Sequence, residues 1–155
     1  MSQVSIGAQA PDFELVSIQD GRRRLSEALK RGPVVLVFYK SSCSTCQFTF
    51  PFIQRIYAKV AKPAPWTLWA VSQDDHDETL DFVRQNGLSF DVLIDEHPYA
   101  VSAAYGLHNV PAIFLVQPDG KIALSDFGFS KDSLNQIAGF PFFTPDDGLP
   151  SSRPG

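Results

Sequence analysis

The chain has 155 residues, a length that suits one domain and can bury a sizeable apolar core without a structural metal or several disulfides. Its 17 acidic and 13 basic residues give a formal net charge of −4, so it lacks the basic field that would indicate binding to nucleic acid or to an anionic membrane. The first ten residues have neither the positive start nor the apolar core of a secretion signal, and no apolar run approaches membrane-spanning length, which predicts a cytoplasmic protein.

The N-terminal part of the chain predicts a β-hairpin followed by a short helix. In residues 12–25, apolar side chains precede Asp20-Gly21, a dipeptide that favours a tight hairpin turn. We interpret the three arginines at 22–24 as a charged strand edge in solvent, because successive strand residues point to opposite faces. Ser26 is the predicted N-cap of a helix that runs to Leu29, ahead of a Gly-Pro pair.

The most apolar stretch begins directly after Pro33. Residues 34–38 are all valine, leucine or phenylalanine. A half-exposed strand would alternate apolar with polar residues, so this run predicts a strand that is buried on both faces. We therefore place it in the interior of a sheet.

The chain has two cysteines, and both follow this strand, at positions 43 and 46. Ser41 and Ser42 are predicted to cap a helix whose first turn carries Cys43, so that unpaired backbone N–H groups point at the sulfur and favour its thiolate. A free thiol has a pKa near ~8.5, and a helix N-terminus in a Cys-x-x-Cys motif can lower it to roughly 3.5–7.5. Cys46 comes one helical turn later and can close a disulfide with Cys43.

The rest of the chain alternates predicted helices with predicted strands. In order, the pattern predicts a helix from the cysteines to Val60, a strand at 66–72, a helix from Asp75 to Gly87, a strand at 90–94, a helix at 98–105, two strands at 112–116 and 121–127 joined by Pro118-Asp119-Gly120, and a helix from Ser130 or Asp132 to Ala138. Such an order predicts a mixed α/β sheet.

The composition changes from Phe140 onward. Four prolines between positions 141 and 154 oppose regular structure, so we predict a domain of residues 1–143 followed by a mobile, proline-rich tail at 144–155. The rings of Phe140, Phe142 and Phe143 are predicted to cover part of the sheet or the cysteine helix. Docking onto a partner is the alternative.

Three segments of the chain carry a family pattern: residues 7–15 (GAQAPDFEL), the strand that leads into Cys43-Ser44-Thr45-Cys46, and residues 109–116 (NVPAIFLV). In order and separation they resemble the thioredoxin-like redoxin superfamily, with its AhpC/TSA-like members, and most closely the TlpA- and ResA-type thiol-disulfide oxidoreductases. The resemblance covers most of the chain. It implies a thioredoxin-like α/β fold, with a central mixed sheet flanked by helices and an N-terminal β-hairpin.

The resemblance also implies thiol-disulfide exchange through the Cys43-Ser44-Thr45-Cys46 pair. In the reductive direction Cys43 attacks a substrate disulfide and Cys46 resolves the mixed disulfide, and the oxidative direction reverses these steps. The redox group is then the Cys43–Cys46 disulfide itself, with no cofactor and no metal. The expected partners are protein or small-molecule disulfides or dithiols and a thiol reductant such as a thioredoxin or glutathione system, with no nucleic acid and no membrane.

Pro111 is a further candidate site residue. In thioredoxin-like proteins the matching proline is cis and faces the cysteine pair, so the resemblance implies a cis Val110–Pro111 bond. The backbone of Val110 would then lie beside Cys43 and pair with an extended substrate segment, in the manner of strand addition. An ordinary trans proline at a strand edge is the alternative.

Asp74 is a candidate for proton transfer. It follows the strand at 66–72, at about the position where the ResA-like branch has a partly buried glutamate. A carboxylate with a raised pKa there could exchange a proton with Cys46. Alternatively, Asp74 and the acidic residues just after it form a solvated helix start that the helix dipole favours.

The chain departs from thioredoxins at three positions. Ser42 and Thr45 stand where thioredoxins usually have tryptophan and proline, and Val37 stands near the place of their buried acid. The resemblance therefore implies neither a redox potential nor a route for protons.

Thiol-dependent peroxide reduction is one alternative function, because residues 10–13 (APDF) also begin many peroxiredoxins. Those enzymes have a threonine three residues before their cysteine and bind peroxide with an arginine. Here Lys40 stands at the threonine position, and no arginine occurs between Arg84 and Arg153.

Two other classes stay open. The cysteines together with His97 or His108 could hold zinc or copper, although the copper-binding relatives of this fold space their cysteines by three residues. The second class is a redox-inactive interaction domain that keeps its cysteine pair. As for location, a periplasmic or exported protein without its signal peptide is the alternative to a cytoplasmic one.

Overall fold

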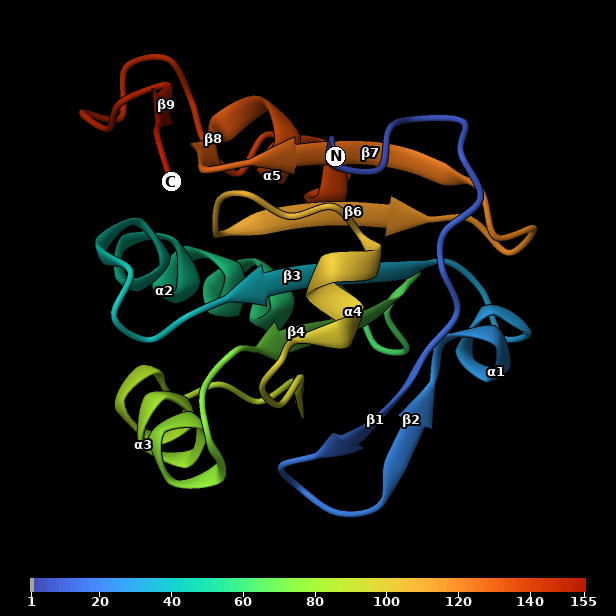
Figure 1. The fold of residues 1–155 in the computed structure, drawn as a ribbon. Helices are drawn as coiled ribbons and strands as arrows, with labels where there is room; N and C mark the ends of the chain where they lie inside the picture. The colour runs from blue at the N-terminus through green and yellow to red at the C-terminus, as the bar shows by residue number, and fades with distance from the viewer. Residues whose placement is uncertain (1) are drawn as a thin grey trace.

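A seven-stranded mixed β-sheet forms the centre of the computed structural model, which describes residues 2–155 (Figure 1). β3 pairs in parallel with β4 and β4 with β5, whereas the other neighbours pair antiparallel. In their order across the sheet, the strands are β2 (Arg22–Arg24), β1 (Glu14–Ser17), β5 (Asp91–Ile94), β4 (Thr67–Ser72), β3 (Val34–Tyr39), β6 (Ala112–Val116) and β7 (Ile122–Phe127).

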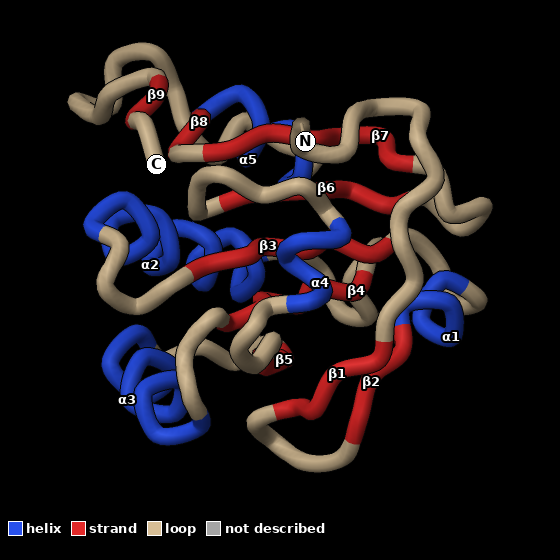
Figure 2. Tube along the Cα trace, viewed as in Figure 1, coloured by secondary structure: helices blue, strands red, loops and turns tan. Residues whose placement is uncertain are grey.

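Five helices among the described residues cover the two faces of this sheet (Figure 2). They are α1 (Leu25–Leu29), α2 (Ser44–Lys59), α3 (His76–Asn86), α4 (Ala100–Ala104) and α5 (Lys131–Ala138). Apolar side chains of α2, α3 and α5 pack on one face, and those of α1 and α4 pack on the other. The arrangement confirms the predicted α/β class, with a central mixed sheet flanked by helices and an antiparallel N-terminal hairpin of β1 and β2.

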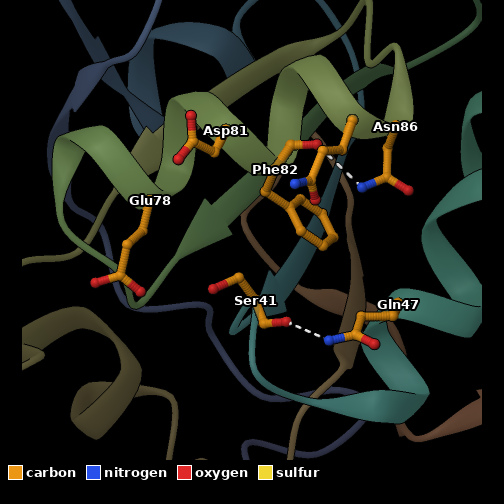
Figure 3. A pocket seen from close by; sticks show the side chains of 7 residues that line it. Ser41, Gln47, Glu78, Asp81, Phe82 and Asn86 are labelled. Atoms are coloured by element: carbon orange, nitrogen blue, oxygen red, sulfur yellow. Dashed lines mark hydrogen bonds between the residues drawn. The ribbon is translucent and has the colours of Figure 1, made fainter.

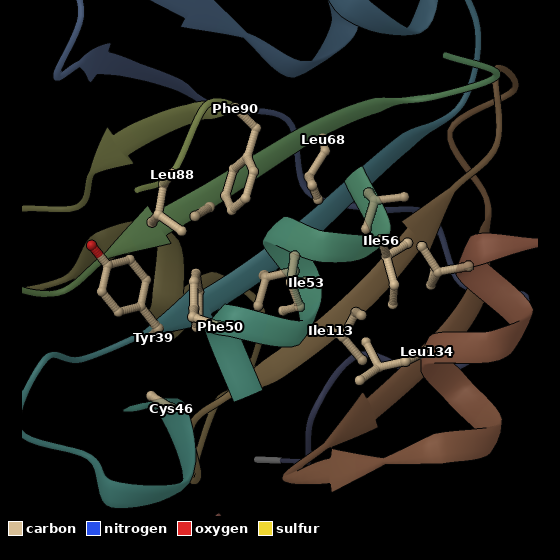
Figure 4. Close-up of a cluster of buried hydrophobic side chains, with 14 of the residues drawn as sticks. Tyr39, Cys46, Phe50, Ile53, Ile56, Leu68, Leu88, Phe90, Ile113 and Leu134 are labelled. Carbon is tan, nitrogen blue, oxygen red and sulfur yellow. The ribbon is translucent and has the colours of Figure 1, made fainter. Parts of the chain in front are cut away.

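The strand β3 divides the apolar core into two layers. All six of its residues are buried, as the unbroken apolar run predicts. Since successive strand side chains point to opposite faces, Val35, Val37 and Tyr39 join the cluster beneath α2, whereas Val34 and its alternate neighbours join the cluster beneath α1 and α4. Figure 4 shows the first cluster, in which Phe50, Ile53 and other α2 side chains lie against the sheet.

The start of α1 differs from the prediction. The helix begins at Leu25, and its N-cap is Arg24, whose side chain makes no capping hydrogen bond. Ser26 is therefore not the cap. Its backbone N–H is instead bound by Asp12 Oδ1 at 2.9 Å, a partner that lies 14 residues away in the sequence. A carboxylate from a distant part of the chain thus binds a free backbone N–H at the helix start, whereas the sequence pattern predicts a serine cap.

The C-terminal residues form a short second sheet. β9 (Ser152–Arg153) pairs antiparallel with β8 (Phe129–Ser130), although the prolines predicted no regular structure in this part of the chain. The buried ammonium of Lys131 also holds the segment, because its Nζ donates to Asp147 at 2.6 Å and to the Thr144 carbonyl at 3.0 Å. The boundary at residue 143 and the mobility of residues 144–155 stay predictions.

The aromatic residues before this segment pack as predicted. Phe143 is buried, and its ring lies 5.3 Å from that of Phe52 on α2 and 5.4 Å from that of Phe129. These rings therefore join α2 to the C-terminal part of the chain. None of the helices that the structure describes has the length and apolar content needed to cross a lipid bilayer.

Candidate active site

The N-terminus of α2 places the two cysteines. The N-cap of this helix is Cys43 itself, in an extended conformation, and its sulfur accepts a hydrogen bond from the backbone N–H of Cys46 at 3.1 Å. The predicted capping by Ser41 or Ser42 is therefore wrong. Cys43 is the last extended residue before the helix, so its own side chain is the one that reaches back to the third helical N–H.

The two thiols differ in their exposure. Cys43 is partly exposed, whereas Cys46 is fully buried in the same apolar cluster as Tyr39 and Phe50 (Figure 4). Burial raises the pKa of the Cys46 thiol above its ordinary value, and the neighbouring Cys43 thiol and the Asp74 carboxylate act in the same direction. Cys46 is therefore a neutral thiol at pH 7, and Cys43 is the sulfur that faces solvent.

The loop before β6 lies against Cys43. The Val110–Pro111 peptide bond is cis, as the resemblance implies. The Cys43 thiol donates to the Val110 carbonyl across 3.3 Å, and the carbonyl of the buried Pro111 accepts from the backbone N–H of Gly128 at 2.7 Å. The structure thus brings Val110 and Pro111 to the exposed cysteine.

Asp74 lies at the end of β4, beside the loop that leads to the cysteines. Its carboxylate is buried, and Oδ2 accepts from the backbone N–H of Ser41 at 2.8 Å. The residue therefore does not belong to a solvated helix start. α3 begins after it, with Asp75 as the N-cap that accepts from the Glu78 N–H at 2.8 Å.

Two open, polar cavities border this loop. The first, of about 430 Å³, separates Ser41 and Gln47 from the side chains of α3 (Figure 3). Gln47 Nε2 donates to the Ser41 carbonyl at 2.7 Å and so fixes the loop on that side. The second cavity, of about 500 Å³, is lined by residues that include Lys40, Asp74, Asp75, Glu96 and His97. Within residues 2–155, no three or more His, Cys, Asp or Glu side chains come together as a candidate metal site.

The C-terminal segment also reaches the cysteine pair, which the sequence did not indicate. The hydroxyl of Thr45 donates to the Pro154 carbonyl at 2.6 Å, and Arg153 Nη2 lies 3.4 Å from Ser44 Oγ. Both of these α2 residues stand between the cysteines. Because β9 pairs with β8, Arg153 and Pro154 contact α2 residues that lie 109 positions earlier in the sequence. No local pattern in the proline-rich segment predicts such a contact.

Comparisons with known proteins agree with this geometry. Residues 6–125 match the AhpC/TSA family. Thiol-disulfide oxidoreductase ResA of Bacillus thuringiensis is 28% identical over 139 residues, which are 89% of this chain and 78% of that protein. ResA of Bacillus subtilis is 28% identical over 132 residues, which are 84% of this chain and 72% of that protein. The crystal structure of the thioredoxin domain of a thiol-disulfide oxidoreductase from Bacteroides vulgatus superposes with a TM-score of 0.77 at 21% identity, over 88% of this chain and 97% of that one.

Proposed function

The chain belongs to the AhpC/TSA family and is a thiol-disulfide oxidoreductase, and we propose that Cys43 is its attacking thiol and Cys46 its resolving thiol. The unequal exposure of the two sulfurs carries this assignment: one faces solvent at a helix N-terminus, and the other is buried one turn behind it. An incoming disulfide meets Cys43 first. Cys46 is reached only by the sulfur of Cys43.

In the reductive direction two sulfur exchanges follow each other. The Cys43 thiolate attacks one sulfur of the substrate disulfide, which forms a mixed disulfide and releases the first substrate thiolate. Cys46 then gives up its proton and attacks the sulfur of Cys43, which forms the Cys43–Cys46 disulfide and releases the second substrate thiolate. Two electrons pass from the cysteine pair to the substrate, and the oxidative direction reverses both exchanges.

We propose that Val110 and Pro111 form the backbone clamp for the substrate. The contact between the Cys43 thiol and the Val110 carbonyl supports this role, because a peptide chain lying beside Cys43 meets the backbone of Val110. An extended substrate segment can pair with that backbone as an added strand. Main-chain pairing of this kind is compatible with many substrate side chains.

Asp74 is proposed as the group that accepts the proton of Cys46. Its buried carboxylate lies in the loop region of the cysteines and is one cause of the raised pKa of the Cys46 thiol. A buried thiol with a raised pKa needs a base before it can attack the mixed disulfide.

Replacing Asp74 with asparagine is expected to slow the resolution step while leaving the first attack unchanged. Asparagine keeps an oxygen for the Ser41 N–H but cannot take a proton, so resolution at neutral pH should fall on the order of 10²-fold. The deficit should shrink between about pH 7 and pH 9, because the thiolate fraction of a thiol with a raised pKa grows as pH rises. Rapid-quench measurement of mixed-disulfide decay reports the step. Asp75→Asn, which preserves an N-cap residue, is the matched control, and equal decay rates in the two variants would remove Asp74 from the mechanism.

We also propose a redox group, partners and a compartment for this protein. The Cys43–Cys46 pair is the redox group and works without a further cofactor. Its partners are protein or small-molecule disulfides or dithiols, and a thioredoxin or glutathione system returns it to the dithiol form. We place the protein in the cytoplasm, and cell fractionation distinguishes this compartment from the periplasm.

A redox titration with thiol trapping tests the proposed function. The purified protein is equilibrated in glutathione buffers of increasing potential, quenched, alkylated and weighed by mass spectrometry. Both cysteines should convert together, as a two-electron couple, and the protein should accelerate reduction of a model disulfide by dithiothreitol. A Cys43 thiol that resists alkylation in the native reduced protein, or an absence of turnover with any model disulfide, would refute the assignment. Peroxide turnover with the same reductant distinguishes a peroxidase.

A further inference from the structure

One outward face of α2 carries aromatic and cationic side chains that continue away from the cysteines. Phe48, Phe52, Arg55 and Lys59 are spaced by four, three and four residues, so they follow one another along the same side of the helix. Arg55 and Lys59 are exposed, and the two phenylalanines are partly exposed. The C-terminal part of the chain adds Phe142 and Arg153 to this side.

These six side chains form a connected ladder, which we call the α2 strip. The Arg153 guanidinium lies 4.9 Å from the ring centroid of Phe48, and the Phe48 ring lies 5.4 Å from that of Phe52. Arg55 lies 5.7 Å from the Phe52 ring and 5.4 Å from the Phe142 ring, and Lys59 lies 5.8 Å from the Phe142 ring. The cations are therefore held in place by aromatic faces rather than by carboxylates.

The positive charge of the strip is not neutralised. Among the ion pairs of residues 2–155, none involves Arg55, Lys59 or Arg153. Asp147 lines the same cavity as Arg55 and Lys59, but its carboxylate pairs with Lys131 at 2.6 Å. Three uncompensated cations on one face are notable in a chain whose net charge is −4. The first turn of α3, on the other side of the cysteine loop, is acidic.

The strip lines a hollow and ends at the reactive pair. A cavity of about 510 Å³ is lined by residues that include Phe52, Arg55, Lys59 and Phe142. At the other end, Arg153 Nη2 lies 3.4 Å from the hydroxyl of Ser44, the residue directly after Cys43. A peptide bound along the strip therefore has one end beside the attacking sulfur.

We propose that the α2 strip docks an acidic segment of the protein that exchanges disulfides with Cys43. This inference rests on the proposed function and adds the class of partner. Cation–π contact leaves the N–H donors of Arg55 and Lys59 available to carboxylates, as well as those of Arg153 that do not bind Ser44. The aromatic rings between them accept apolar side chains of the same segment. Charge complementarity of this kind sets partner choice and association rate.

Two peptide substrates of the same length and opposite charge test the proposal. They are cystine peptides of identical length in which the residues next to the cysteine are glutamates in one and lysines in the other, and hydroxyethyl disulfide serves as a small uncharged substrate. The wild-type protein should favour the acidic peptide in kcat/KM on the order of tenfold at low ionic strength, and salt should erode this preference. Arg55→Glu with Lys59→Glu, and separately Arg153→Glu, should remove or invert it, whereas Arg153→Lys should retain it.

A matched control is the double charge reversal Arg31→Glu with Lys121→Glu, at two exposed cations that are outside the strip. This variant should keep the preference for the acidic peptide. This control variant should also turn over hydroxyethyl disulfide at the wild-type rate. For the strip variants the readout is the ratio of kcat/KM for the two peptides, because a change in the reactivity of Cys43 itself affects both peptides and cancels in the ratio. A wild-type protein without preference, or a preference that survives reversal of the strip, overturns the docking proposal, as does an Arg153→Glu variant that accelerates all three substrates equally. A wild-type protein that does not turn over hydroxyethyl disulfide at all would instead refute the proposed function.

Discussion

Cys43→Ser is expected to lower thiol-disulfide exchange by roughly three orders of magnitude or more, because it removes the nucleophile while leaving the fold intact. Cys46→Ser is expected to behave differently. Its Cys43 thiol can still attack, but the mixed disulfide has no internal thiol to resolve it and should accumulate in a single turnover. The two variants therefore separate attack from resolution.

The two sulfurs have different environments. Cys43 is partly exposed at the helix N-terminus, whereas Cys46 is fully buried beneath it. Mass spectrometry of the quenched reaction should show one bound substrate chain on Cys46→Ser and none on Cys43→Ser. Ser42→Ala, a change at an exposed serine in the same loop, is the control and should turn over normally. Substrate trapped on Cys46 in the Cys43→Ser protein would reverse the assignment of roles.

Features encoded by neighbouring residues were predictable from the sequence. The unbroken apolar run of β3, the Asp20-Gly21 turn and the Ser130 cap of α5 each depend on residues within a few positions of one another. Hydrophobic periodicity and turn chemistry report such local preferences directly. The order of these elements was enough to predict the mixed α/β sheet.

Features of the site that depend on distant partners were not predictable in the same way. The burial of Asp74 follows from its bond to Ser41, 33 residues earlier, and the sequence around Asp74 shows only a run of acidic residues. The contact of Arg153 with Ser44 depends on the pairing of β9 with β8. The cap of α2 was mispredicted for a subtler reason: serine is the stronger capping residue, but the turn before the helix places the sulfur of Cys43 in the capping position.

Phe50→Ala is expected to lower the free energy of unfolding by about 3–5 kcal/mol, the usual cost of removing a fully buried phenylalanine. The Phe50 ring is 0% exposed and lies 4.6 Å from the ring of Tyr39 and 5.3 Å from that of Phe82, so it joins α2 to β3 and α3. Its loss leaves a cavity one helical turn behind Cys46. Denaturant unfolding of the reduced protein measures the change.

The same substitution at Phe48 is the matched control, because this phenylalanine is on the same helix but is only partly buried. Phe48→Ala should lower the free energy of unfolding clearly less, because the Phe48 side chain buries less apolar surface when the chain folds. Phe50→Ala should also speed alkylation of Cys46 under native conditions, because the cluster that covers this thiol loosens, whereas Phe48→Ala should not. A loss below about 1 kcal/mol for Phe50→Ala, or an equal loss for both variants, would show that the packing of α2 does not protect the resolving cysteine.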